Sequence, residues 1–191
     1  MIDEREGNRK WQDSEDLELK QLFDYDTFKD LGKGTPTPDS YKQIPCHVVY
    51  DVKWDGRHKS RFVAGGHRTD TPIESTHSAV VSLLGVRVIT FLSELNGLEL
   101  WNTDIGNAHL ESHTSEQVCF VAGAEFGELA GHTLIICKAQ YGLKSSGKCW
   151  HDRLHDVLRS MGFAPSKAEE DIWMRDCGDH HECIGVCVWT T

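Results

Sequence analysis

The sequence predicts an α+β fold of the split βαβ type, with one sheet that carries helices on one face. Two stretches with helical spacing of apolar residues, 77–95 and 146–161, are interleaved with short runs rich in β-forming residues. The resulting order of helix, three strands, helix and two strands is typical of such folds. With 191 residues, of which 39% are hydrophobic, the chain is long enough to bury one core.

An N-terminal helix is predicted over 11–23, where acidic residues occupy the early turns and favour a helix start. Leu19, Leu22 and Phe23 can form its apolar face. The segment 32–40 (GKGTPTPDS) has the glycine and proline content of a linker. We therefore divide the chain into an N-terminal helical arm with its linker, 1–40, and a main domain, 41–191.

Two β-rich runs, 47–53 and 60–65, flank the polar turn 54–57 and predict a β-hairpin. Lys59 and Arg61 are two residues apart, so they share one face of the second strand. Because the net charge is −10, a local group of cations is the relevant footprint for phosphate, rather than the charge of the whole chain. A solvated, charged edge strand would show the same pattern, and the sequence leaves this alternative open.

Two helices frame the second half of the chain. The helix over 77–95 is expected to be long and buried, because its apolar residues fall on one face and Asn96-Gly97 ends it. The helix over 146–161 carries Trp150, Leu154 and Leu158 on one face and ends before Gly162. Strands are predicted at 98–105, 118–121, 134–139, 172–175 and 183–188.

Composition excludes several classes of protein. No apolar run approaches the roughly 20 residues needed to cross a bilayer, and the charged N-terminus does not fit a signal peptide. The seven cysteines lack the regular spacing of a secreted scaffold, which indicates reduced thiols. We therefore expect an intracellular protein, cytoplasmic or nuclear, that is neither secreted nor bound to a membrane.

The cysteine and histidine residues near the C-terminus leave open a zinc-binding interaction domain. These residues are Cys177, His180, His181, Cys183 and Cys187. Their spacing matches no zinc finger, so this alternative is the weaker one. The eleven histidines are expected to contain no HxxxH pair on a helix, and none is assigned as a metal ligand.

Asp104 lies at the end of the predicted strand 98–105, where the turn Gly106-Asn107 begins. A site for two divalent ions needs several carboxylates from different strands at a common edge, because hard ions take oxygen ligands. Asp104 is a candidate for the first of these ligands. A single aspartate does not make such a site, and a role as a turn or capping residue is the alternative.

Four segments, taken together, resemble one family. In chain order they are HKSRFVAGGH (58–67), TDIGNAHL (103–110), KAQYGLKSSGKCW (138–150) and SKAEEDIWMRD (166–176). They are similar to the successive motifs of copia-type retrotransposon reverse transcriptases, from about residue 41 to the C-terminus. The resemblance implies the fingers and palm of an RNA-directed DNA polymerase that uses Mg²⁺ or Mn²⁺, a dNTP and an RNA or DNA primer-template.

The resemblance also implies residue roles. Asp104 matches the first catalytic, metal-binding aspartate, and Lys59 and Arg61 match cations that meet the triphosphate. His109 stands where the family usually has Tyr or Phe under the sugar of the nucleotide, and Ser145 stands where Gln is common. The loop that supports nucleotide and template corresponds to Tyr141, Gly142, Lys144 and Gly147.

The sequence departs from the family at the last hairpin. Family members place an aromatic residue, Val or Met, and two aspartates where this chain has Cys187, Val188, Trp189 and Thr190. Neither an indole nor a hydroxyl supplies anionic oxygen, so the resemblance predicts a defective metal site and little polymerase activity. The thumb and the ribonuclease H module of the polyprotein are expected to be absent. A non-catalytic nucleic-acid-binding remnant is the alternative function.

Overall fold

The computed structural model describes residues 2–69, 76 and 78–186, and its helices and strands confirm the α+β class. The α-helices are α1 (Ile2–Glu6), α2 (Lys10–Asp24), α3 (Leu83–Leu95) and α4 (Ser146–Ser160), and the 3₁₀ helices are η1 (Gly66–Arg68), η2 (Ala108–Glu111) and η3 (Ala124–Leu129). The strands are β1 (Phe28–Lys33), β2 (Lys42–Gln43), β3 (Cys46–Val52), β4 (His58–Ala64), β5 (Val118–Val121), β6 (His132–Ile136), β7 (Ala164–Pro165), β8 (Ile172–Asp176) and β9 (His181–Gly185). No helix in these described ranges is long and apolar enough to cross a membrane.

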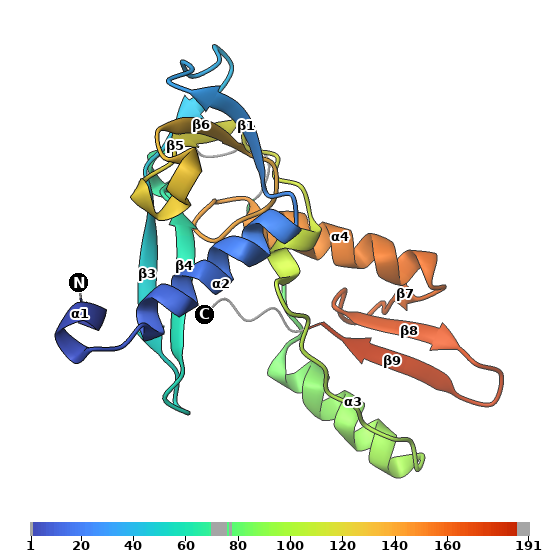
Figure 1. Cartoon of the computed structure of the whole chain (residues 1–191). Coiled ribbons are helices and arrows are strands. Elements are labelled where there is room, and N and C mark those ends of the chain that lie inside the picture. The colour runs from blue at the N-terminus through green and yellow to red at the C-terminus, as the bar shows by residue number, and fades with distance from the viewer. Residues whose placement is uncertain (1, 70–75, 77, 187–191) are drawn as a thin grey trace.

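The described strands pair in three sheets instead of the single sheet that was expected (Figure 1). One sheet has the order β1-β6-β5-β2, in which β2 pairs parallel to β5 and the other pairs are antiparallel. The antiparallel pair β3–β4 forms the predicted hairpin. The third sheet, β7-β8-β9, is antiparallel throughout and contains the two predicted C-terminal strands.

The main core lies where α2 crosses the hairpin β3–β4 (Figure 1). Strand β4 alternates in burial, so Ser60, Phe62 and Ala64 face inward. Phe62 packs against Phe120 and Phe126, with ring centroids 5.3 and 5.1 Å apart. Leu19 and Leu22 of α2 belong to the same cluster of buried residues, so the N-terminal arm shares this core with the hairpin. The division of the chain at residue 40 remains a prediction.

Several elements match their predictions closely, namely α2, the hairpin β3–β4, β5, α4 and β8. Strand β1 was missed, because its sequence FKDLGK has no alternation of apolar and polar residues. It is a strand because it pairs with β6, with Phe28 opposite Ile136. Strand β9 ends at Gly185 in the described part of the chain, and the last residues of its predicted range, 187 and 188, lie outside that part.

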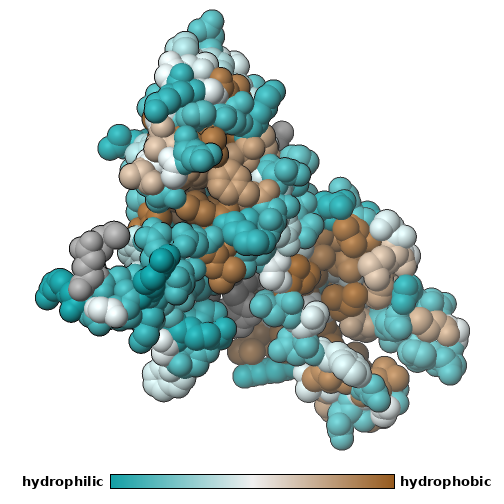
Figure 2. All heavy atoms as spheres, in the orientation of Figure 1, coloured by the Kyte–Doolittle hydropathy of each residue, from teal (hydrophilic) through white to brown (hydrophobic). Residues whose placement is uncertain are grey.

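Helix α3 differs from the expected buried helix over 77–95. It begins at Leu83, after Ser82, whose Oγ accepts a hydrogen bond from the Gly85 backbone N–H at 2.9 Å. Leu84, Phe91 and Leu95 are 70%, 64% and 67% exposed, so the prediction of burial is wrong. The helical period gives the apolar face, but a face is buried only where another element covers it. Figure 2 shows hydrophobic side chains on the surface in the region of α3.

The strand predicted at 98–105 is absent, and this prediction is wrong. Residues 98–105 form no regular element, and Leu100 and Trp101 are 60% and 84% exposed. A β-strand needs a hydrogen-bonded neighbour, and the described strands offer none to this segment. Asp104 therefore lies in an exposed connection between α3 and η2 rather than at the end of a strand.

Candidate functional site

The hairpin β3–β4 carries the two cations that the sequence singled out. Lys59 is opposite Asp51 in the hairpin, and Arg61 Nη1 lies 3.9 Å from Asp51 Oδ2. The Arg61 side chain is only 17% exposed. Burial lowers the pKa of Lys59, the charges of Arg61 and Lys53 lower it further, and Glu18 and Asp104 partly oppose this. Two cations are thus crowded in a partly desolvated place, where an anionic ligand would relieve their repulsion.

Glu18 of α2 is a carboxylate beside these cations that the sequence analysis missed. Its Oε1 accepts a hydrogen bond from the Phe62 backbone N–H at 3.0 Å. Burial raises the pKa of Glu18, whereas this hydrogen bond and the charges of Lys59 and Arg61 act in the opposite direction. No local pattern could have found this contact, because 44 residues separate the two partners.

Asp104 is near enough to the hairpin for its charge to act on Lys59, where it favours the charged amine and so acts to raise the pKa of Lys59. It does not lie in a group of metal ligands within the described residues. The only group there with three possible ligand atoms close together is His151, His155 and Asp171. The donors described around Asp104 therefore do not fit a centre for two divalent ions. Trp189 and Thr190, at the aligned positions of the missing aspartates, lie outside the described residues.

The ring of Tyr141 contacts both the guanidinium of Arg61 and the ring of His109. The Arg61 Cζ lies 5.8 Å from the centroid of the Tyr141 ring. The rings of Tyr141 and His109 meet edge to face, with centroids 5.3 Å apart and an interplanar angle of 80°. Burial lowers the pKa of His109, and a hydrogen bond with the backbone of Ser146 only partly opposes this. His109 is therefore held as a neutral, planar ring at neutral pH.

We expect His109→Phe to remove part of the acid sensitivity of the fold. The unfolded chain takes up a proton on His109 as the pH falls through about 6.5, whereas the folded chain resists it because the folded pKa is lowered. The free energy of unfolding of the original chain should therefore fall between about pH 7 and pH 5 more steeply than that of the variant. Urea unfolding at a series of pH values measures this. His67→Phe at an exposed position is the matched control, and equal pH dependence of all three proteins would contradict the expectation.

The loop after β6 is locked against the end of β4 by two glycines. Gly142 has φ +93°, and a Cβ placed on it would lie 2.0 Å from the Ala64 carbonyl oxygen. A Cβ on Gly66 would lie 2.2 Å from the Gly142 carbonyl oxygen. The Ala64 backbone N–H donates to the Tyr141 carbonyl oxygen at 2.8 Å. Only glycine permits this approach of two backbones, which fixes Tyr141 beside Arg61.

Hydrogen bonds to the Glu116 carboxylate hold the rest of the loop in place. The Ser145 backbone N–H and Oγ donate to Glu116 Oε1 at 2.9 and 2.8 Å, and Thr69 Oγ1 donates to Glu116 Oε2 at 3.1 Å. Lys144 Nζ donates to the Thr69 carbonyl oxygen at 2.6 Å. A Cβ on Gly147 would lie 3.1 Å from Ser78 Oγ. These contacts support the loop, and a direct contact of Ser145 with a nucleotide stays a prediction.

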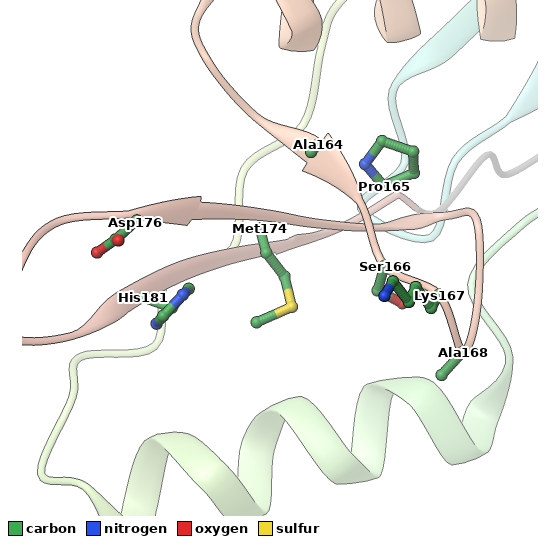
Figure 3. A pocket seen from close by; sticks show the side chains of 8 residues that line it. All are labelled: Ala164, Pro165, Ser166, Lys167, Ala168, Met174, Asp176 and His181. Atoms are coloured by element: carbon green, nitrogen blue, oxygen red, sulfur yellow. The ribbon is translucent and has the colours of Figure 1, made fainter.

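Among the predicted residues, Arg61, Tyr141 and His109 contact one another in turn, and the charges of Arg61 and Asp104 act on Lys59. The loop residues Gly142, Lys144, Ser145 and Gly147 take part in the contacts that support this group. A surface hollow of about 510 Å³ lies elsewhere, on the sheet β7-β8-β9 near α3. Figure 3 shows Met174, Asp176 and His181 among its lining residues, and none of the predicted site residues.

The expectation that no histidine pair has HxxxH spacing on a helix is wrong. His151 and His155 lie four residues apart on α4, and with Asp171 they offer ligand atoms within 4.8 Å of one another. The spacing itself was visible in the sequence. Among the described residues, the cysteines and histidines of the C-terminal zinc alternative form no such group, and Cys187 lies outside those residues.

The class of protein is shown by comparison with known families. A sequence model of the family described as "Reverse transcriptase (RNA-dependent DNA polymerase)" matches residues 33–190, and the chain belongs to this family. The resemblance to copia-type retrotransposon enzymes is thereby confirmed.

Two curated relatives are the Retrovirus-related Pol polyproteins from transposons RE2 and RE1 of Arabidopsis thaliana. Each is 24% identical to this chain over 152 residues, which cover 75% of the chain. The chain spans only about a tenth (10%) of the length of each relative. No solved structure matches the chain.

Proposed function

We propose that this chain is the fingers and palm part of a retrotransposon reverse transcriptase that keeps the triphosphate side of its site but is defective in nucleotidyl transfer. The observation that carries this is the partly buried pair of hairpin cations, in which Arg61 is 17% exposed and lies against Tyr141, and on which the charge of Asp104 acts through Lys59. In this proposal, β3–β4 belongs to the fingers, and α3, α4 and β8–β9 belong to the palm.

The proposed roles follow from the chemistry of each side chain. The guanidinium of Arg61 offers paired N–H donors that suit phosphate oxygens, and Lys59 adds a point charge. His109 and Tyr141 present planar rings beside these cations, where the sugar of an incoming dNTP would lie. The backbones of Gly66 and Gly142 hold this arrangement in place.

The proposed defect concerns the divalent ions, Mg²⁺ or Mn²⁺, on which the family depends. Among the described residues, Asp104 has no group of further ligands around it. Trp189 and Thr190, at the positions of the aspartate pair, carry no carboxylate. The chain's own residues would therefore bind and orient a nucleotide without carrying out its transfer.

A non-catalytic nucleic-acid-binding remnant is the second candidate. It is favoured by the fact that the pair Lys59 and Arg61 needs no metal to attract phosphate. Its substrate would be an RNA or DNA primer-template. Because the chain spans about a tenth (10%) of its polyprotein relatives, we propose that other polyprotein segments act beside it in either case.

Binding to a primer-template should depend steeply on salt, and the hairpin cations should carry part of that dependence. We expect Lys59→Gln with Arg61→Gln to reduce the slope of log affinity against log salt by up to about 1.8, since each phosphate contact on a duplex contributes about 0.9. Fluorescence anisotropy of a labelled RNA–DNA hybrid between about 50 and 200 mM salt measures this.

The matched control removes two cations that lie exposed elsewhere, through Lys29→Gln with Lys167→Gln. The control changes the net charge by the same amount and should keep most of the slope. Circular dichroism checks that both variants are folded. Equal slopes for the two double variants would show that the hairpin is not the phosphate-binding surface.

A further inference from the structure

Helix α4 and the residue before β8 bring two imidazoles and a carboxylate together, away from Lys59 and Asp104. His151 and His155 share a face of α4 because they are four residues apart. Asp171 directly precedes β8, and its Oδ1 lies 2.8 Å from His151 Nε2 and 3.4 Å from His155 Nε2. One carboxylate oxygen is thus shared by two imidazole rings.

This cluster is buried. Asp171 and His155 are 2% and 8% exposed, and the His151 side chain is 12% exposed. The fully buried Trp173 covers it, with its ring centroid 4.7 Å from that of His155. His155 Nε2 is buried, points to Asp171 and makes no hydrogen bond among the described residues. A buried carboxylate beside such a nitrogen is costly unless a cation or a proton compensates it.

We propose that His151, His155 and Asp171 bind one divalent transition-metal ion, with zinc as the preferred ion. Zinc lies about 2.0–2.2 Å from nitrogen and oxygen ligands, so two ligands of a tetrahedral site are about 3.3–3.5 Å apart. The 3.4 Å separation of Asp171 and His155 already has this value, and a small rotation of His151 would widen the 2.8 Å separation. Two imidazoles and a carboxylate suit zinc and leave a fourth position for water.

Asp152 stands where a supporting carboxylate would be expected. Metal-bound imidazoles usually donate their second ring N–H to a carboxylate or carbonyl, which fixes the orientation of the ring. His151 Nδ1 lies 3.8 Å from Asp152 Oδ1, and this carboxylate also pairs with Lys148. His151 Nδ1 is buried and makes no hydrogen bond among the described residues, so it is free to donate to this carboxylate when the metal is bound.

An ion at this place would fasten α4 to the sheet β7-β8-β9. Apart from such an ion, α4 packs against this sheet through a small hydrophobic cluster of Leu158, Phe163, Trp173 and Val186. The Asp171 carbonyl oxygen accepts a hydrogen bond from the Val186 backbone N–H at 2.9 Å, so Asp171 also holds the end of β9. Metal binding should therefore raise the thermal stability of the whole chain.

The test is a titration of the chelator-treated full chain with Zn²⁺, followed by calorimetry, and with Co²⁺, followed by absorption. We expect one ion per chain, a higher Tm with zinc, and a cobalt spectrum without sulfur-to-metal charge transfer. His151→Gln and Asp171→Asn should each weaken binding by about 100-fold or more, since even outer-shell partners contribute 10- to 100-fold.

The control is Cys177→Ser with His180→Gln. This variant removes two of the possible zinc ligands near the C-terminus and should leave binding unchanged. No binding by the original chain would overturn the proposal. So would binding that is lost in the control and kept in Asp171→Asn. If the ligand variants fail to fold, the cobalt spectrum of the original chain decides, because thiolate charge transfer would refute a site made of two histidines and an aspartate.

Discussion

Replacing Gly142 with alanine is expected to lower the free energy of unfolding by about 2–5 kcal/mol. Two effects add at this position. A residue with a Cβ costs roughly 1–2 kcal/mol at positive φ, and Gly142 has φ +93°. The new Cβ would also lie 2.0 Å from the Ala64 carbonyl oxygen, an overlap that only a backbone shift can relieve, at a further cost of about 1–3 kcal/mol. Urea unfolding followed by circular dichroism measures the loss.

Gly178→Ala separates the two effects. Gly178 has φ +91°, close to that of Gly142, but nothing lies within 4 Å of a Cβ placed there. This control should lose only the roughly 1–2 kcal/mol of backbone strain. Equal losses in the two variants would mean that the loop does not press against the end of β4, and the position of Tyr141 beside Arg61 would lose its explanation.

The second large effect is expected in the rate of DNA synthesis, measured by primer extension. The original chain is expected to extend a DNA primer on an RNA template at no detectable rate with Mg²⁺ or Mn²⁺, because the aligned aspartate pair is missing. Trp189→Asp with Thr190→Asp should raise the rate by at least about 10²- to 10³-fold, the size of effect that one group stabilising transition-state charge commonly has.

The matched control is Trp189→Asn with Thr190→Asn, which introduces side chains of similar size without charge and should stay inactive. Robust synthesis by the original chain, abolished by Asp104→Asn, would contradict the proposed defect. Synthesis by the asparagine variant at the same rate as the aspartate variant would contradict the role assigned to charge.

The sequence predicted best what local periodicity determines. Helices α2 and α4 and the hairpin β3–β4 were found because their apolar residues recur with the period of the element. The strand expected at 98–105 and the burial of α3 were wrong for a common reason. Both depend on a neighbouring element that covers them, and a pattern of apolar residues does not say whether that neighbour is present.

In the candidate site, too, local motifs predicted some residues, whereas others depend on contacts between distant parts of the chain. Lys59, Arg61, Asp104, His109 and Tyr141 could be named from motifs. The structure places Arg61, Tyr141 and His109 in contact and brings Asp104 near enough for its charge to act on Lys59. Glu18 and Glu116 could not be named, because their partners lie 44 and 29 residues away in the chain. The pair His151 and His155 was visible as a spacing, but the approach of Asp171 required the fold.

In the proposed site, Lys59 and Asp104 act on one bound nucleotide with opposite charge. Equilibrium binding of a dNTP in EDTA and low salt, to the original chain, Lys59→Gln and Asp104→Asn, tests it most directly. At surface-like dielectric each charge contributes on the order of 1 kcal/mol, so Lys59→Gln should weaken binding about 5-fold and Asp104→Asn should strengthen it by a similar factor. If both variants bind as the original chain does, or shift in the same direction, the two residues do not face a common triphosphate.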